Sequence, residues 1–141
     1  MTDFTLSATV TGRYEAVLDR VRALLADAGF GVLTEIDLQA TLRVKLGVEV
    51  PPTVILGACR PTLAYRALQA DHRIATMLPC NVVVTSQDDG HARVEVFDPE
   101  AMTTFSDAPE VAAVAGEARD RLTRMLNTLA GGQEDPDAAG T

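Results

Sequence analysis

The stretch "LPCNVVVTSQDDGHARVEVF", residues 78–97, decides the fold because it has the pattern of a β-hairpin. Alternate positions of its two runs form one apolar face, made of Leu78, Cys80, Val82, Val84, Val94 and Val96. Arg93 and Glu95 fall on the opposite face, and "DDG" supplies the turn. The pattern predicts two antiparallel strands with one face in the core and the other facing water.

The segments on either side of this hairpin predict a central strand and two helices. "TVILGA", residues 53–58, is a continuous apolar run, typical of a central strand covered on both faces. Pro61 opens a helix through residue 70. After the hairpin, apolar residues at helical spacing predict a long helix that ends at Gly131. Residues 131–141, "GGQEDPDAAGT", have the composition of a disordered tail.

The N-terminal part predicts two strands, a helix between them and one ambiguous segment. Residues 4–10 and 30–36 alternate as strands, the second with Phe30, Val32, Thr34 and Ile36 on one face, and residues 13–28 carry a helical apolar stripe. Residues 38–47 fit either a helix, with Asp37 and Gly47 at its ends, or an alternating strand. The short helix is favoured because both end signals agree with it.

Together these elements predict one domain over residues 1–130, in the order β-α-β-(α)-β-α-β-β-α. Strands with one wet face and a tight hairpin favour a largely antiparallel sheet. The fold class is therefore α+β, a two-layer sandwich with the helices on one face of the sheet.

The amino-acid composition indicates which binding partners are disfavoured and in which cellular compartment the protein is expected. Twelve basic and twenty acidic residues give a net charge of −8, which disfavours binding to nucleic acid or to anionic membrane. The chain has no apolar run long enough to span a bilayer and no signal-peptide pattern, so a cytoplasmic protein is expected. In a reducing compartment its two cysteines are expected to be free thiols.

Cys59 is the first candidate for chemistry because it ends a predicted strand just before a helix begins. The helix N-terminus, together with the cation of Arg60, would favour the thiolate and lower its pKa. The alternative is a buried cysteine that packs as a small apolar side chain. No general base for Cys59 is identifiable in the sequence, so both interpretations stay open.

Cys80 is assigned to the core by its position in the alternating strand. If the two strands are neighbours, Cys59, Cys80 and His72 would form a ligand set for copper or zinc. Asn81 points to the other face and would either contact a ligand or close the kink at Pro79.

Asp37 and Lys45 are the remaining candidate pair, two turns apart on one face if their segment is helical. The alternative is a helix cap and a solvated lysine. No nucleophile elbow, phosphate-binding loop, dinucleotide fingerprint or zinc-protease motif is present in the sequence, which disfavours most enzyme classes.

The sequence resembles the domain-of-unknown-function 302 family from about Phe4 to Leu129. Three motifs carry the resemblance: Asp37 through Lys45-Leu46-Gly47, Ile55-Leu56-Gly57-Ala58-Cys59 with Pro61, and Leu78-Pro79-Cys80-Asn81. Arg60 departs from the family, which often has Asn there. The resemblance implies a short stand-alone prokaryotic protein, a dimer, with a layout similar to the TATA-binding-protein type. It implies no activity.

Three functional hypotheses follow, with a non-enzymatic function favoured. The first is a domain that binds a small molecule or a soft metal ion near Cys59 and Cys80. The second is a thiol-based redox or transfer protein that uses Cys59 as its nucleophile. The third is a structural homodimer, in which the sheet face rich in Thr and Ser meets a partner.

Overall fold

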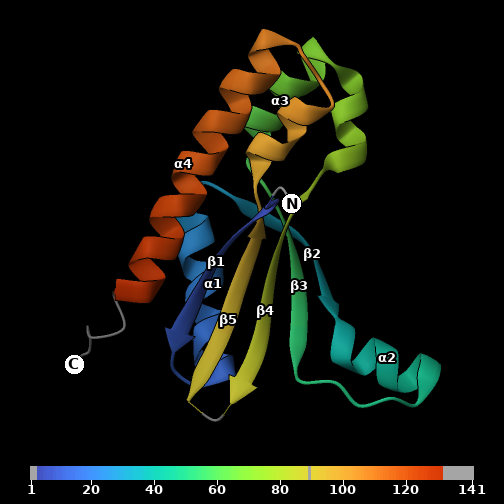
Figure 1. The fold of residues 1–141 in the computed structure, drawn as a ribbon, viewed down its shortest axis with the longest axis vertical. Helices are drawn as coiled ribbons and strands as arrows, with labels where there is room; N and C mark the ends of the chain where they lie inside the picture. The colour runs from blue at the N-terminus through green and yellow to red at the C-terminus, as the bar shows by residue number, and fades with distance from the viewer. Residues whose placement is uncertain (1–2, 89, 132–141) are drawn as a thin grey trace.

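The fold is built on one five-stranded antiparallel sheet (Figure 1). The computed structural model describes residues 3–88 and 90–131. Within these residues the strand order is β1-β5-β4-β3-β2. The strands are β1 (Thr5–Thr11), β2 (Gly31–Asp37), β3 (Thr53–Cys59), β4 (Cys80–Asp88) and β5 (His91–Phe97). The predicted α+β class is confirmed.

The hairpin of β4 and β5 forms the middle of the sheet, as the alternation predicted. Val82 pairs with Val96 and Val84 with Val94, and all four side chains are fully buried. On the opposite face Arg93 and Glu95 form an ion pair of 3.4 Å between Nε and Oε2 and stay partly exposed.

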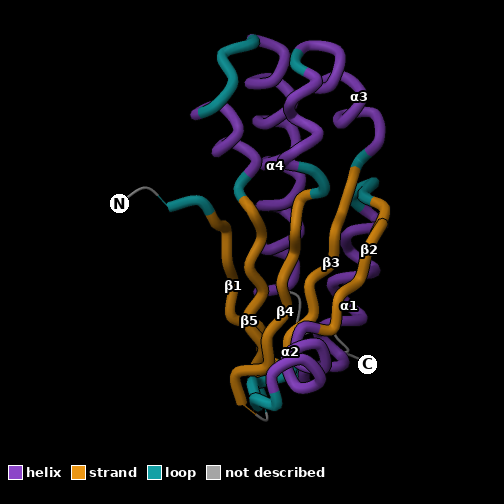
Figure 2. The backbone as a smooth tube through the Cα atoms, turned by 90° about the vertical axis from the view of Figure 1, so that its right-hand side faces the viewer, coloured by secondary structure: helices purple, strands orange, loops and turns teal. Residues whose placement is uncertain are grey.

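The helices lie in a second layer and at one end of the sheet (Figure 2). α1 (Tyr14–Asp27) and α4 (Pro109–Gly131) cover one face and bury their apolar stripes against it. Beyond the end of the sheet, α3 (Pro61–Ala70) and the short 3-10 helix η2 (Pro99–Thr104) pack against α4, and the 3-10 helix η1 (His72–Met77) packs against α3. The predicted order of strands and α-helices is confirmed.

β3 is central, but only one of its faces is covered by helices. Val54, Leu56 and Ala58 are buried beneath the helical layer. Thr53, Ile55 and Cys59, on the other face, are half-buried because no second helical layer covers them. The predicted covering of both faces was therefore wrong.

The segment after β2 is helical, as favoured from its end signals. α2 (Leu38–Leu46) begins at Asp37, whose Oδ1 accepts a hydrogen bond of 2.9 Å from the Ala40 amide, and ends at Gly47, which has φ of 69°. α2 has no buried side chain, and every residue of β2 is exposed. β2 and α2 thus contribute little to the core, although their patterns are apolar.

Among the described residues, no helix has both the length and the apolar character needed to cross a membrane. The tail predicted for residues 131–141 lies, from residue 132 on, outside the described part of the chain; Gly131 is the last residue of α4.

Candidate functional site

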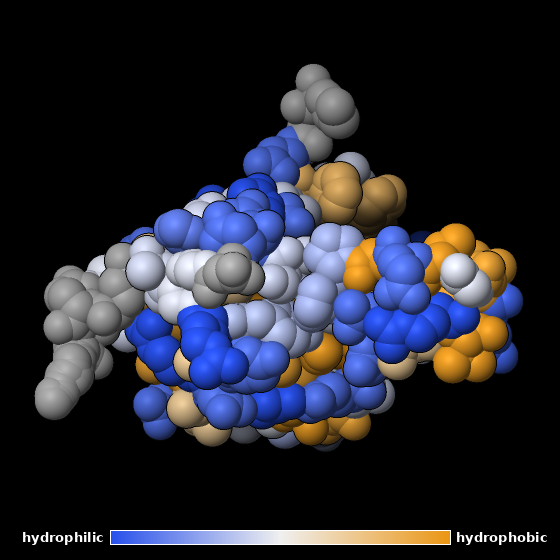
Figure 3. Space-filling model, turned by 90° about the horizontal axis from the view of Figure 1, so that it is seen from below, coloured by the Kyte–Doolittle hydropathy of each residue, from blue (hydrophilic) through white to orange (hydrophobic). Residues whose placement is uncertain are grey.

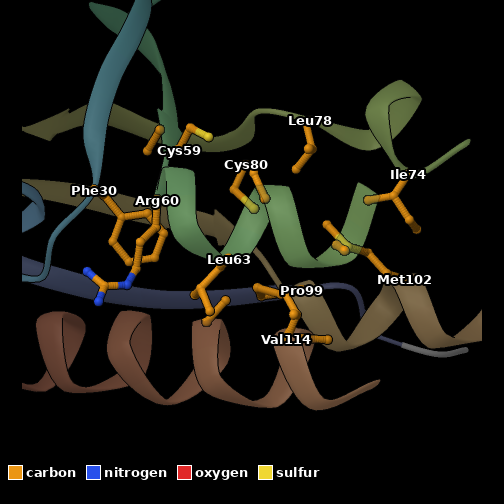
Figure 4. A pocket seen from close by; sticks show the side chains of 15 residues that line it. Phe30, Cys59, Arg60, Leu63, Ile74, Leu78, Cys80, Pro99, Met102 and Val114 are labelled. Carbon is orange, nitrogen blue, oxygen red and sulfur yellow. The ribbon is translucent and has the colours of Figure 1, made fainter. Parts of the chain in front are cut away.

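An apolar cavity of about 30 Å³ lies where β3 and β4 meet the helices at the end of the sheet (Figure 4). Its walls come from all layers of the fold, and its lining residues with polar or sulfur-containing side chains are Cys59, Arg60, Cys80 and Met102. The remaining lining residues are apolar, among them Phe30, Leu63, Ile74 and Val114. Both cysteines of the chain are among the lining residues, Cys80 on the helix-covered face of the sheet and Cys59 on the opposite face of β3.

Cys59 reaches this cavity as the last residue of β3, where it pairs with Gly31 of β2. Its thiol is free and half-buried. Burial raises the pKa of the Cys59 thiol, because the thiolate loses hydration there. Of the two interpretations of Cys59, this direction disfavours the thiolate stabilised by the start of α3 and agrees with a cysteine that packs as a small apolar side chain.

Arg60 does not act as a cation on the thiol, because its guanidinium is engaged elsewhere. Arg60 Nη1 donates a 3.4 Å hydrogen bond to the carbonyl oxygen of Ala28, at the C-terminal end of α1. Arg121 Nη1, from α4, donates a 3.3 Å hydrogen bond to the same oxygen. Arg60 thus ties α1 to the start of α3, and its stem forms part of the cavity wall.

Cys80 is buried, with 6% of its surface exposed, and pairs with Ala58 in the neighbouring strand. Burial raises the pKa of its thiol to about 11, and the charge of the nearby Cys59 thiolate adds to the effect. The core position predicted from strand alternation agrees with this environment. At neutral pH both thiols are held in their neutral form.

Met102 is a cavity residue that the sequence did not single out. It lies in η2, is buried, and places a third sulfur-bearing side chain in the cavity wall. The surrounding "DPEAMTTF" has neither the alternation of a strand nor a helical stripe, so no local signal marked Met102 as a core residue.

The two 3-10 helices that carry Ile74 and Met102 are fixed to each other by a polar network. Ser106, the one buried polar residue found in the described chain, donates a 2.8 Å hydrogen bond from Oγ to Asp71 Oδ2. Arg73 forms a second contact with the same carboxylate, with Nη2 at 2.8 Å from Oδ2. Hydrogen bonds from Arg73, the larger cause, and from Ser106 lower the pKa of Asp71. The Asp71 carboxylate therefore stays charged at neutral pH.

The other predicted site residues lie away from the cavity lining. His72 is exposed at the start of η1, and the described residues include no group of three or more His, Cys, Asp and Glu side chains that could hold a metal ion. The predicted Cys59, Cys80 and His72 ligand set is therefore not assembled. Asn81 pairs with Gly57 and is exposed, in a separate groove beside Pro79.

Asp37 and Lys45 lie at the opposite end of β3 from Cys59. Asp37 pairs with Val54, and one of its carboxylate oxygens accepts the hydrogen bond that caps α2. Lys45 is exposed in the last turn of the same helix, about 12 Å further along its axis. The structure therefore places Cys59, Arg60 and Cys80 in the lining of one cavity, whereas Asp37 and Lys45 lie far from it.

Comparisons with known proteins agree with the fold. A family model described as "Domain of unknown function DUF302" matches residues 6–129. A solved structure, "Crystal structure of uncharacterized conserved protein DUF302 from Bacillus stearothermophilus", superposes with a TM-score of 0.82 at 26% sequence identity. The match covers 91% of this chain and 99% of that chain. A search of curated proteins found no significant match.

Proposed function

Because this chain belongs to the DUF302 family, whose description assigns no activity, we propose its function from the cavity itself: it is a non-enzymatic protein that binds the soft metal ion Cu(I) between Cys59 and Cys80. The observation that supports the proposal is that three sulfur-bearing residues, Cys59, Cys80 and Met102, are among the residues that line one apolar cavity. Thiolate and thioether ligands select soft ions such as Cu(I).

The size of the cavity favours an ion over an organic ligand. Its volume of about 30 Å³ is that of a single small occupant. Pockets that bury drug-sized molecules typically measure about 300–1,000 Å³. A larger small molecule would need α3 and α4 to separate, at the cost of the packing of buried side chains such as Leu63 and Val114.

The ligand set favours copper over zinc. Zn²⁺ in structural sites takes four Cys, His or carboxylate ligands. The cavity offers two thiols and a thioether, with His72 outside it. Two thiolates with one Cu(I) carry a net charge of −1.

The raised thiol pKa values disfavour the alternative of Cys59 as a redox or transfer nucleophile. Such a cysteine needs a thiolate near neutral pH, but burial acts in the opposite direction on both thiols here. A metal ion can still displace the two protons, because the energy of forming two metal–sulfur bonds offsets the cost of ionising buried thiols.

Anaerobic titration of the reduced protein with Cu(I), in competition with a chromogenic Cu(I) chelator, tests this proposal. We expect one Cu(I) per chain and ultraviolet absorption from Cu(I)–thiolate charge transfer. Cys59→Ser and Cys80→Ser should each weaken binding about 50-fold, since each removes one of two thiolate ligands. Met102→Leu should weaken it less, because the thioether is uncharged.

Met125→Leu is the matched control for Met102→Leu. Met125 is equally buried, on α4, but does not line the cavity, so this isosteric change should leave the affinity unchanged. Absence of stoichiometric binding in the folded wild type, or equal affinity in the two Cys→Ser variants and the wild type, would overturn the proposal.

A further inference from the structure

The unpartnered surface of β2 and α2 is the feature of this fold that the packing of one chain does not explain. Six exposed apolar side chains lie on β2, on α2 and just after it, and are called here the β2–α2 face: Val32, Leu33, Ile36, Val44, Leu46 and Val48. Val32 and Ile36 lie on opposite faces of the sheet, since they pair with Ala58 and Ile55, so the name covers the whole edge of the molecule at β2. Val44 is 81% exposed and Leu46 69%. Seen from below, apolar residues gather on this side of the molecule, where α2 projects from the sheet (Figures 1 and 3).

Few interactions within the chain hold α2 in place, among them a 3.1 Å hydrogen bond from Gln39 Nε2 to the carbonyl oxygen of Val50. The helix has nine residues and no buried side chain. Isolated helices shorter than about 12–15 residues are marginal in water, and most helical stability in proteins comes from packing an apolar face. Its Asp37 and Gly47 caps together contribute only about 1–2 kcal/mol. A surface that covers Val44 and Leu46 would supply the missing packing.

β2 adds an open edge of backbone to the same surface. It is the last strand of the sheet and pairs only with β3 among the described strands. Its outer edge therefore offers unpaired N–H and C=O groups that can pair with a further strand. A partner with both a strand and an apolar surface would pair with the backbone edge of β2 and cover the apolar side chains of α2.

The chain itself has the right chemistry to be that partner. Although the net charge is −8, residues 31–52 carry only three acidic and two basic side chains. One of the acids, Glu35, is already paired with Arg22. Two copies of this face can therefore meet without the repulsion that two strongly acidic surfaces would produce.

The remainder of the sequence does not supply an alternative cover. Residues 132–141, outside the described part, read "GQEDPDAAGT", with no large apolar side chain.

We propose that a second copy of this chain covers the β2–α2 face, with the two β2 edges side by side about a two-fold axis. A two-fold contact uses the same patch twice, so each copy provides the strand edge and the apolar helix that the other needs. This inference is independent of the Cu(I) site. It also places the homodimer expected from the sequence on a different surface, at the edge of the sheet instead of its Thr- and Ser-rich open face.

Sedimentation of the full chain across the micromolar range tests the interface. We expect a dimer for the wild type, and a dissociation constant raised about 50-fold by the double substitution Val44→Glu with Leu46→Glu, which buries charges in the contact. Both side chains are exposed in the protomer, so the folded protomer should persist by circular dichroism. Tyr65→Glu, at a 63% exposed position on α3, is the control and should leave the dimer intact.

Hydrogen exchange adds a readout that is local to the interface. Amides of β2 and α2 should lose protection on dilution and in the double variant, while those of β4 and β5 keep theirs. A wild type that sediments as a monomer at these concentrations contradicts the proposal. So does a dimer of undiminished affinity in the double variant.

Discussion

Gly57→Ala is expected to lower the free energy of unfolding by about 3 kcal/mol, at the upper end of the cost of overpacking a core. Gly57 lies in the middle of β3, with the hydroxyl of Thr34 and the ring of Pro79 over the position of a side chain. An added Cβ would lie 2.7 Å from Pro79 Cγ and closer still to Thr34 Oγ1. Thr34 lies in β2 and Pro79 directly precedes β4, so a Cβ at residue 57 requires one of these side chains or its strand to shift.

Urea unfolding measures this loss, and Gly116→Ala is the matched control. Gly116 lies inside α4, where a Cβ would meet only Glu100 Oε2 at 3.6 Å, an ordinary contact. The same chemical change should therefore stabilise the protein there by about 1 kcal/mol, through helix propensity. Thr34→Ala should recover part of the loss in the Gly57→Ala background. Equal effects of the two glycine substitutions would show that the contacts over Gly57 are not limiting.

Ionisation of Cys80 is expected to remove about 3 kcal/mol of stability in alkali, at about 1.4 kcal/mol per pKa unit. The fold raises the pKa of this thiol from the ordinary value of 9.0 to about 11, so the native state prefers the neutral form. Between these two values the unfolded chain loses the proton first. The free energy of unfolding should therefore be unaffected below pH 9.0, fall as the pH rises, and level off above about pH 11.

Comparison of the wild type with Cys80→Ala isolates this contribution. Both proteins are unfolded with urea under reducing conditions from neutral pH to pH 11, and the difference between their stabilities is followed. The smaller side chain costs a constant amount at all pH values, whereas the thiol contribution changes with pH. Tyrosine and lysine ionise in both proteins and cancel in the difference. Parallel stability curves would mean that Cys80 does not carry the alkaline loss.

Local patterns in the sequence were sufficient to predict most of the strands and α-helices. Alternation located the strands of the β4–β5 hairpin, and Pro61 marked the start of α3, because strand and helix periods are properties of a few consecutive residues. The Asp37 and Gly47 caps correctly favoured a helix over a strand for residues 38–46. The family resemblance agreed with the match over residues 6–129.

The same patterns could not say what each apolar face contacts. The apolar residues of β2 and α2 are exposed because β2 is the edge strand, and strand order is set by the whole sheet. For a related reason, local patterns could not decide between the two interpretations of Cys59. Its local chain offers a helix start and Arg60, but the tertiary structure buries the thiol and turns the guanidinium to Ala28.

The sequence by itself therefore determined the order and type of the elements, the core position of Cys80 and the neighbourhood of Cys59. Only the tertiary structure decided that Cys59, Cys80 and Met102 line one apolar cavity, because η2 brings Met102 there from more than twenty residues further along the chain. The physical reason is the separation along the chain over which each kind of interaction acts. Periodicity and caps act over a few residues, whereas burial, and the pKa values and cavities that follow from it, depend on which distant segments pack together.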